Sequence, residues 1–383
     1  MELYGRKIAV VGGATGGAAT ALLFARAGAR VTLFEKVPAF GAVGAGIGLQ
    51  ANGLAVLRGL GLEATLRHQG CVLGAPRIVD VSGRTLLEAT LPEGGYVLMI
   101  RRSELQEVLR QALEATPGVE IRLDTEVRRA SPDGTVEFPG GESRFDLVVG
   151  ADGVHSRVRE GGDFGARVTC TGISYMRGLS SYEGAWNEEV WTAAGIFGTF
   201  PVRGGTYWYC SMGTRPLREA VARRDAAALR RIWNEALPRT EPILAEVDSF
   251  SRVLVNEVIR VDCARFAAGR LVLVGDAAHA MAPNLGQGAN SALVDAAALV
   301  DELQRAATLE EGLAAYDRRR RLAVRWVQNA SASSGRLAEQ TNAAVRWMRD
   351  RLLMPLVARA AARQVSRTMQ EPPELLERIA ARA

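Results

Sequence analysis

A glycine-rich turn lies close to the amino terminus, at residues 12–17. Residues 7–12 form an apolar run typical of a β-strand, and residues 15–27 form an Ala/Leu-rich run typical of a helix. A tight turn between a strand and a helix presents backbone N–H groups at the helix amino end, where they can bind a pyrophosphate. The residues assigned to this binding are Gly12, Gly13, Ala14 and Gly17.

The same unit ends in a carboxylate. A second strand is expected over residues 30–35, and Glu35 stands at the spacing of an acid that binds ribose hydroxyls. Because a carboxylate repels a 2′-phosphate, Glu35 favours the adenosine of FAD or NAD over that of NADP. Lys36 joins the same cofactor-binding set. Ala14 stands where the dinucleotide fingerprint has its middle glycine, and its methyl group leaves a purely structural turn as the alternative.

Two later segments repeat the pattern of an apolar strand that ends in an acid beside glycine. Residues 145–159 read FDLVVGADGVHSRVR and contain Asp152. Residues 270–290 read RLVLVGDAAHAMAPNLGQGAN, contain Asp276 and lead into an expected helix. Together with the first turn, these segments resemble the FAD-dependent aromatic hydroxylases of the para-hydroxybenzoate hydroxylase superfamily. The resemblance covers most of residues 5–330.

The resemblance implies a role for each feature of the third segment. Asp276 would bind ribityl or ribose hydroxyls of an extended FAD, since a buried carboxylate without partners is costly; helix N-capping is the alternative. Pro283 would lie next to the flavin ring, and a simple loop stop is the alternative. Free N–H groups at the start of the next helix would face the flavin pyrimidine and stabilise an anionic reduced ring. These residues are Gly286, Gln287, Gly288, Ala289 and Asn290.

Further assignments rest on the same resemblance. Asp152 would lie between FAD and a site where NAD(P)H docks transiently, and together with Pro283 it is predicted to be catalytic. Arg102 would bind FAD phosphates, with Arg101 as the alternative if the register shifts by one residue. The glycine-rich stretch 41–48 would run beside the isoalloxazine ring, and a flexible linker is the alternative. Other cofactor contacts are assigned to Gly46, Gly48 and Val127.

The middle of the chain, residues 168–258, changes character because Tyr, Trp, Phe and Thr alternate through strand-like runs. Along residues 206–212, one parity of side chains should face the flavin while the other packs on helices or faces solvent. Trp208, Cys210 and Met212 form the more apolar set and are predicted to line the aromatic substrate, with a plain core role as the alternative. No charged residue of this sheet stands out as a carboxylate clamp, which favours a neutral or bulky substrate.

These motifs require an α/β fold in which a Rossmann-like FAD-binding domain is interleaved with a β-sheet substrate domain and followed by a helical carboxy-terminus. We expect the FAD-binding domain to be split by the substrate domain, since its motifs flank the aromatic-rich middle. The expected limits are 1–165 for its first part (with a substrate-side insertion around 70–100), 166–260 for the substrate sheet, 261–330 for its second part, and 331–383 for the terminal helices.

The composition agrees with a globular enzyme. The chain has 383 residues, of which 48% are hydrophobic, and no apolar run long enough to span a membrane, so a cytoplasmic monomer or homodimer is expected. Four cysteines and three histidines are scattered, which argues against a metal site. The net charge of +5 does not indicate nucleic-acid binding because acids are nearly as numerous as bases. The run 318–321 of four arginines is interpreted as a solvated helix face.

The resemblance implies a reaction as well. NAD(P)H would reduce FAD, dioxygen would add to give a flavin C4a-hydroperoxide, and one oxygen atom would pass to an aromatic or polycyclic substrate. An FAD-dependent epoxidase or prenyl-chain reductase is the alternative enzyme, and a flavin-bound sensor or scaffold that never turns over is a further one. A flavin halogenase is disfavoured because halogenases of this fold use a catalytic lysine. The only lysines here, Lys7 and Lys36, both belong to the first βαβ unit. No side chain is an obvious general base.

Overall fold

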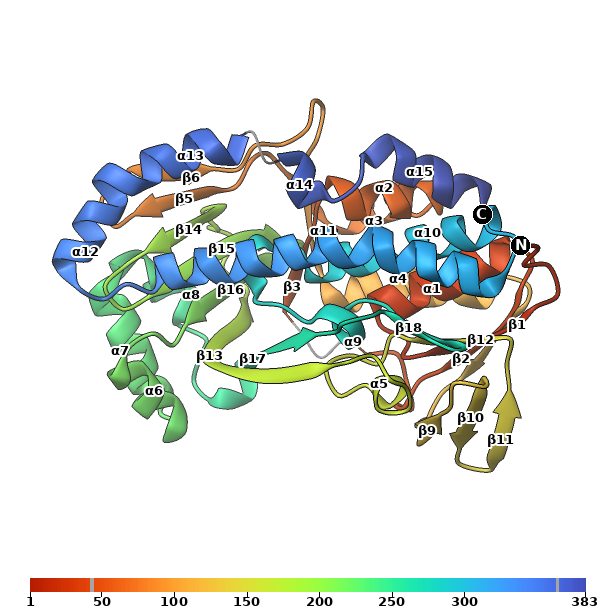
Figure 1. Cartoon of the computed structure of the whole chain (residues 1–383). Coiled ribbons are helices and arrows are strands. Elements are labelled where there is room, and N and C mark those ends of the chain that lie inside the picture. Colours follow the sequence, from red (N-terminus) through yellow and green to blue (C-terminus); the bar gives the residue numbers. More distant parts are fainter. Residues whose placement is uncertain (42–44, 363–364) are drawn as a thin grey trace.

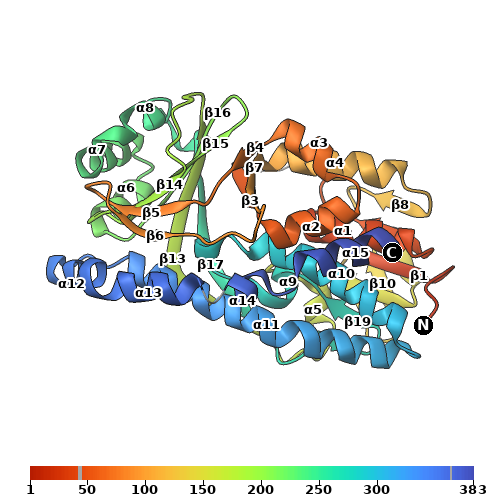
Figure 2. The ribbon, with the colours of Figure 1, turned by 90° about the horizontal axis from the view of Figure 1, so that it is seen from above.

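The computed structural model describes residues 1–41, 45–362 and 365–383. Two large sheets lie side by side, and each is covered by its own helices (Figure 1). Helix α11 (Leu309–Ala338) runs along both halves (Figures 1 and 2). The predicted fold class, a Rossmann-like half interleaved with a substrate sheet and ending in helices, is confirmed.

The first sheet has the strand order β18-β19-β12-β1-β2-β8. All neighbours in it are parallel except β18 and β19, which are antiparallel. A parallel sheet is covered on both faces, which explains why β12 and β19 are fully buried apolar runs. The strands are β1 (Lys7–Val11), β2 (Arg30–Phe34), β8 (Val119–Arg122), β12 (Leu147–Gly150), β18 (Ala267–Ala268) and β19 (Leu271–Leu273).

Three helices cover one face of this sheet (Figure 1): α1 (Thr15–Arg26), α4 (Arg102–Ala115) and α10 (Gly288–Arg305). A small sheet of order β11-β10-β9 covers part of the other face, where the Phe138 ring lies 5.1 Å from the Phe34 ring. Its strands are β9 (Arg129–Ala130), β10 (Thr135–Phe138) and β11 (Gly141–Arg144). Short helical turns follow the main strands: α5 (Arg157–Glu160), α9 (Asp276–His279) and η3 (Pro283–Leu285).

The second large sheet has the order β17-β13-β16-β15-β14-β5-β6, and the two strands at one end of it, β5 and the edge strand β6, come from the segment 70–100. One face is buried under α6 (Arg215–Ala222), α7 (Ala226–Ala236) and α8 (Glu241–Leu244), with η1 (Pro238–Thr240) between α7 and α8 and η2 (Phe250–Arg252) after α8. The strands are β5 (Arg77–Asp80), β6 (Thr85–Glu88), β13 (Arg167–Ser180), β14 (Glu188–Trp191), β15 (Ile196–Val202), β16 (Gly205–Ser211) and β17 (Leu254–Asp262).

A second small sheet, of order β3-β7-β4, contacts both halves, since β7 also touches β15. Helix α2 packs against α10, and α3 packs against α4. This region therefore connects the dinucleotide-binding unit to the substrate sheet. Its elements are β3 (Gly46–Leu49), α2 (Ala51–Gly59), α3 (Glu63–Gln69), β4 (Cys71–Leu73) and β7 (Val97–Arg101).

The carboxy-terminal helices return over both halves. Helix α13 lies over β6, and α15 packs on α2. Two elements cross the domain limits expected from the sequence, because β17 passes residue 260 and α11 passes residue 331. Within the described ranges, every helix is too short or too polar to cross a bilayer. The terminal elements are α12 (Ala343–Met348), η4 (Arg349–Leu353), α13 (Met354–Ala362), α14 (Val365–Met369) and α15 (Pro373–Arg382).

Candidate active site

The predicted cofactor residues meet at one edge of the parallel sheet. Gly12 follows β1, Glu35 follows β2, Asp152 follows β12 and Asp276 lies just beyond β19. Because these four strands are parallel, their carboxyl ends lie at the same edge. Motifs separated by more than 200 residues in the sequence are thereby placed around one site.

The glycine turn has the geometry that the fingerprint requires. Gly12 adopts a φ of +99°, and a Cβ there would lie 2.5 Å from the backbone oxygen of Ala151. A Cβ at Gly17 would lie 1.8 Å from the oxygen of Gly12, so only glycine allows this close packing of helix and turn. Ala14 is the N-cap of α1 with a φ of −71°, which any residue adopts. Its methyl group is therefore tolerated without backbone strain.

The carboxylate of Glu35 holds this turn from the side. It accepts hydrogen bonds from the backbone N–H of Gly13 at 2.7 Å and from that of Val37 at 3.1 Å. The Gln106 side-chain amide donates to the Gly13 oxygen at 2.7 Å. Lys36 is exposed beside them. The acid thus lies directly beside the turn, while its binding to ribose stays a prediction.

Arg102 and Asp276 lie close enough to each other to interact electrostatically. Arg102 begins α4, Asp276 begins α9, and neither side chain has a hydrogen-bond partner among the described residues. Burial, and then the neighbouring cation Arg177, lower the pKa of Arg102, while Tyr207 and Asp276 oppose that change. Arg102 nevertheless keeps accessible surface, as expected for a cation enclosed by protein and open to a ligand on one side. Both groups are available to a ligand.

The amino end of α10 offers free backbone donors. Among the described residues, the N–H groups of residues 288–290 have no hydrogen bond, and the first bonded one belongs to Ser291. The side chains of Gln287 and Asn290 point instead into the protein. Asn290 donates to the oxygen of Gly48 at 3.1 Å, and Gln287 donates to the Gln50 side chain at 2.7 Å. The side chains of Gln287 and Asn290 therefore hold the segment around Gly48 and Gln50, while the backbone N–H groups of residues 288–290 stay free.

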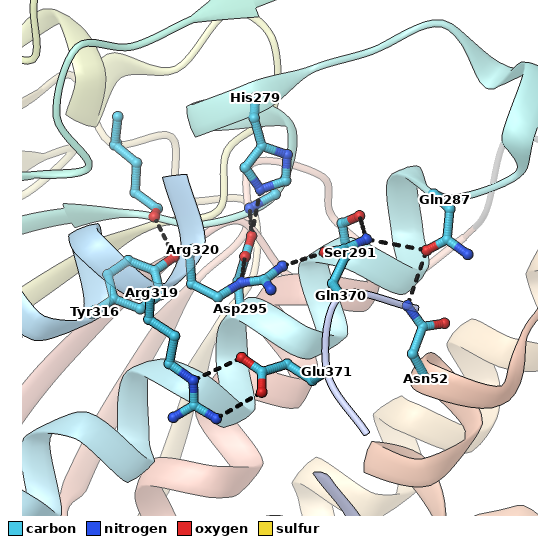
Figure 3. A network of polar contacts seen from close by, with 12 residues as sticks. Asn52, His279, Gln287, Ser291, Asp295, Tyr316, Arg319, Arg320, Gln370 and Glu371 are labelled. Carbon is cyan, nitrogen blue, oxygen red and sulfur yellow. Dashed lines mark hydrogen bonds and ion pairs between the residues drawn. The ribbon is translucent and has the colours of Figure 1, made fainter. Parts of the chain in front are cut away.

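A buried polar network, drawn in Figure 3, connects the third motif to this helix start. Asp295 accepts hydrogen bonds from the N–H of Gly275 at 2.9 Å, from Nε of Arg320 at 2.7 Å and from Nε2 of His279 at 2.5 Å. Burial raises the pKa of Asp295, but His279 and Arg320 outweigh burial and lower it to about 2. The carboxylate is therefore ionised and fixes the turn that carries Asp276.

The network continues to the carboxy-terminal region. Arg320 donates to the side-chain oxygen of Gln370 at 2.5 Å, and Gln370 donates to Ser291 at 2.7 Å and to Gln287 at 3.2 Å. The interpretation of the four arginines 318–321 as a solvated face was wrong for Arg320, which is fully buried. The available signal was Asp295, a lone acid in an otherwise apolar stretch of α10.

The prediction for the substrate sheet chose the wrong parity of β16. Trp208 and Cys210 are fully buried, and Met212 packs against the same cluster. The Trp208 ring stacks on Phe197 at 6.1 Å, and Trp233 of α7 lies 5.1 Å from Phe197. The most apolar side chains thus face the covering helices. Hydrophobicity could not distinguish the faces because both are covered.

Tyr207 and Tyr209 occupy the opposite face of β16, and Tyr207 contacts the predicted cofactor segment at Gly46. A Cβ at Gly46 would lie 2.5 Å from the Tyr207 ring, so the absence of a side chain at this position makes room for the tyrosine, and contact with a flavin stays a prediction. A Cβ at Gly48 would meet the Met99 sulfur at 3.0 Å. On the neighbouring strand, the Tyr175 hydroxyl accepts a hydrogen bond from Asn284 at 2.8 Å. The substrate sheet is therefore joined to the predicted cofactor segments at two points, by Tyr207 with Gly46 and by Tyr175 with Asn284.

Three polar side chains of this face were missed from the sequence. Arg177 pairs across the strands with Tyr209, and its guanidinium has no hydrogen bond or ion pair among the described residues. The Tyr209 hydroxyl donates to Glu189 at 2.5 Å, and Trp191 Nε1 donates to the same carboxylate at 2.6 Å. Burial raises the pKa of Glu189, against the opposing effect of these two donors. In β16, the alternation of the two tyrosines with Trp208 and Cys210 was the available signal.

The remaining predicted residues lie at or near the site in different ways. One oxygen of Asp152 accepts from the N–H groups of Arg157 and Val158 at 2.7 and 3.2 Å, and the other is buried without a partner in the described part of the chain. Pro283 begins η3 and is half-buried. Val127 belongs to the core by its side chain, with 3% of its surface exposed. Residues 42–44 of the glycine-rich stretch lie outside the described residues.

Comparison with known proteins fixes the family. The family described as "FAD binding domain" matches residues 6–331. The chain belongs to this FAD-binding family. The aurachin C monooxygenase/isomerase of Stigmatella aurantiaca is 30% identical over 386 residues, which cover 96% of this chain and 99% of that protein. The 2-heptyl-3-hydroxy-4(1H)-quinolone synthase of Mycobacteroides abscessus is 29% identical over 340 residues, covering 84% and 88%.

A solved structure gives the same result. The tetrameric form of 2-methyl-3-hydroxypyridine-5-carboxylic acid oxygenase is 27% identical to this flavoprotein, with a TM-score of 0.78 and coverage of 94% of this chain and 96% of that one. The resemblance to aromatic hydroxylases predicted from the sequence is confirmed, and so is the predicted enzyme class, an FAD-dependent monooxygenase.

Replacing Asp276 by alanine should weaken FAD binding by about 10-fold to 100-fold, because a hydrogen bond that a hydroxyl donates to a carboxylate contributes roughly 1.5–3 kcal/mol. The dissociation constant is measured by flavin fluorescence during titration of the apoprotein. Asp248→Ala, which removes an exposed carboxylate of the substrate half, serves as the matched control and should leave the constant unchanged. Equal affinities for Asp276→Ala and the unmodified chain would remove Asp276 from the site.

Proposed function

We propose that this monooxygenase inserts one oxygen atom from dioxygen into an aromatic N-heterocycle that carries an ionisable ring oxygen, with NAD(P)H as the reductant. The contact between Tyr207 and Gly46 carries the proposal, because it joins the flavin-side loop to the sheet face that holds Arg177 and Tyr209. Two similar proteins support the substrate class, since one is named for a 3-hydroxy-4(1H)-quinolone and the other for a 3-hydroxypyridine carboxylic acid.

The residues at the carboxyl edge of the parallel sheet fit FAD. The turn at Gly13 would hold the pyrophosphate, Glu35 the adenosine ribose and Asp276 the ribityl chain, with Arg102 close to Asp276. The free N–H groups of residues 288–290 would face the flavin pyrimidine. When bound and reduced by NAD(P)H, FAD supplies the electrons that activate dioxygen.

The two residues predicted to be catalytic flank this arrangement. Asp152 has a buried oxygen without a partner among the described residues, so it is ready to accept a hydrogen bond from a ligand. We infer that this ligand is the transiently docked nicotinamide nucleotide. Pro283 directly precedes Asn284, whose amide binds the Tyr175 hydroxyl, so the proline is held between the flavin side and the substrate sheet.

Aromatic side chains would orient a flat substrate on the sheet. The rings of Phe200 and Tyr209 stack at 6.1 Å with an angle of 9°, and the Tyr207 ring lies 5.9 Å from Tyr209. Arg177 lies on the same face, where its guanidinium can stabilise a ring oxygen as that oxygen becomes anionic. A heterocycle that binds as a neutral molecule and then loses a proton would be oriented by the aromatic rings and stabilised as an anion by Arg177.

Glu189 and Tyr209 would take up the proton of the substrate. The substrate O–H donates to the Tyr209 oxygen while the Tyr209 hydroxyl proton passes to the Glu189 carboxylate, so a ring oxyanion and a neutral carboxylic acid result. Burial favours the protonated form of Glu189 and makes its carboxylate a stronger base. The electron-rich anion that forms is the species that accepts an oxygen atom.

The proposed reaction is tested with labelled dioxygen. The FAD-loaded protein is bleached anaerobically with NAD(P)H, mixed with a hydroxyquinoline or hydroxypyridine, and exposed to ¹⁸O₂. One labelled atom should enter the ring, as seen by mass spectrometry. Label found only in peroxide or water over a broad panel would contradict the hydroxylase, and so would a labelled epoxide from an alkene. Reduction of an alkene without oxygen would favour the prenyl-chain reductase instead.

The proton acceptor is tested with Tyr209→Phe and Glu189→Gln. Either change should lower kcat/KM by about 100-fold or more, the usual contribution of general base catalysis, and should remove the acidic limb of the pH profile. In the unmodified enzyme that limb should lie above the ordinary range of a glutamate, because burial raises the pKa of Glu189 and the ionised form is the active one.

Tyr207→Phe is the matched control, since it keeps a ring on the same face and removes a hydroxyl without a hydrogen bond in the described structure. It should retain the acidic limb. An unchanged pH profile in Glu189→Gln would contradict the role of the pair while leaving the oxygen-transfer result untouched.

A further inference from the structure

The segment from α12 to α13 presents an apolar stripe to solvent. Val345, Met348, Leu352 and Leu356 recur at intervals of three and four residues and are 39%, 52%, 59% and 60% exposed. Trp347, beside them, is 60% exposed. Apolar residues at this helical spacing ordinarily face a core. Contiguous exposed patches of this kind mark an interaction surface.

The opposite face of the same segment is firmly attached to the molecule. Arg349 is 3% exposed, lies 4.6 Å above the Trp191 ring and donates to the oxygen of Leu337 at 2.8 Å. Met354 is 1% exposed and packs in the cluster that contains Tyr175. The stripe therefore points outward because its helix is fixed from behind. Figures 1 and 2 show α12 and α13 at one outer end of the molecule.

The charges around the stripe are positive. Arg346, Arg351 and Arg359 have no ion pair within the described ranges. The one acid between residues 345 and 359, Asp350, is bound to Arg349 at 2.6 Å. Arginines beside an apolar stripe complement a surface that is both apolar and anionic, with tryptophan at the boundary.

We propose that this face, from α12 through α13, docks on the surface of an anionic lipid bilayer, with its helices lying in the plane of the interface. The apolar side chains would enter the boundary between headgroups and acyl chains, and the three arginines would bind lipid phosphates. Docking would bring the enzyme to the lipid bilayer, in which apolar aromatic compounds accumulate. It is independent of the chemistry proposed for the active site.

A second copy of the chain fits the same face less well. In a two-fold dimer the identical patch lies opposite itself, so the arginines of one copy would approach those of the other. No unpaired carboxylate within residues 345–359 is available to offset that repulsion. A bilayer with anionic headgroups supplies the missing negative charge.

The test uses the FAD-loaded full chain in flotation with phosphatidylcholine vesicles, with and without phosphatidylglycerol. The protein should float with the anionic vesicles, and added salt should release it because the charge attraction is screened. The triple variant Met348→Gln/Leu352→Gln/Leu356→Gln should lower the partition coefficient by at least about tenfold, since it removes the apolar surface that enters the bilayer. Arg346→Gln/Arg351→Gln should lower binding to anionic vesicles only.

Leu322→Gln is the matched control, because Leu322 is a leucine of α11, 67% exposed, outside this face. All variants should keep FAD and the near-ultraviolet circular dichroism of the unmodified chain. Absence of flotation with anionic vesicles would overturn the proposal. It would also be overturned if the unmodified chain were a dimer that the triple variant converts to a monomer, because the face would then be an interface between copies.

Discussion

The ionised carboxylate of Asp295 is the interaction on which the flavin side of the structure depends. Asp295 and Arg320 are both fully buried, and a buried charge is tolerated only when it is paired and hydrogen-bonded. The pair is complemented by His279 and by the backbone of Gly275, so the turn that carries Asp276 is fixed to α10 and α11. Through Gln370 the same network reaches the start of α10. One charge cluster thus sets the positions of two segments that are predicted to face the cofactor.

The substrate half is ordered by a different constraint, which is that its sheet is covered on both faces. Helices α6 to α8 bury the most apolar side chains, and the cofactor-facing side keeps Tyr175, Arg177, Tyr209 and Glu189. The polar and aromatic side chains of this face are therefore available next to the predicted flavin site, while the apolar side chains of the other face still form the core. The close approach of Tyr207 to Gly46 sets the distance between the halves.

Residue patterns with a local cause could be predicted from the sequence. The glycine turn, the acids at strand ends and the helix after Gly288 each follow from short-range geometry, and the structure has them where the motifs require. Features that depend on long-range packing could not be predicted. The face of β16 that is buried in the core is decided by α7, and the burial of Arg320 is decided by Asp295 and Gln370. Glu189 gains its partner Tyr209 only when β14 and β16 lie in one sheet.

Asp295→Asn shows whether the Asp295 cluster positions the segments that are predicted to bind FAD. Asp301→Asn is the matched control, because Asp301 is equally buried in α10 and binds Arg319 but does not contact the Gly275 turn. The measurement is the FAD dissociation constant of each apoprotein, with the free energy of unfolding determined in parallel. We predict that both variants lose stability and that only Asp295→Asn binds FAD at least about tenfold more weakly. An unchanged FAD affinity in Asp295→Asn, or an equal loss of FAD affinity in both variants, would show that the Asp295 cluster does not position these segments.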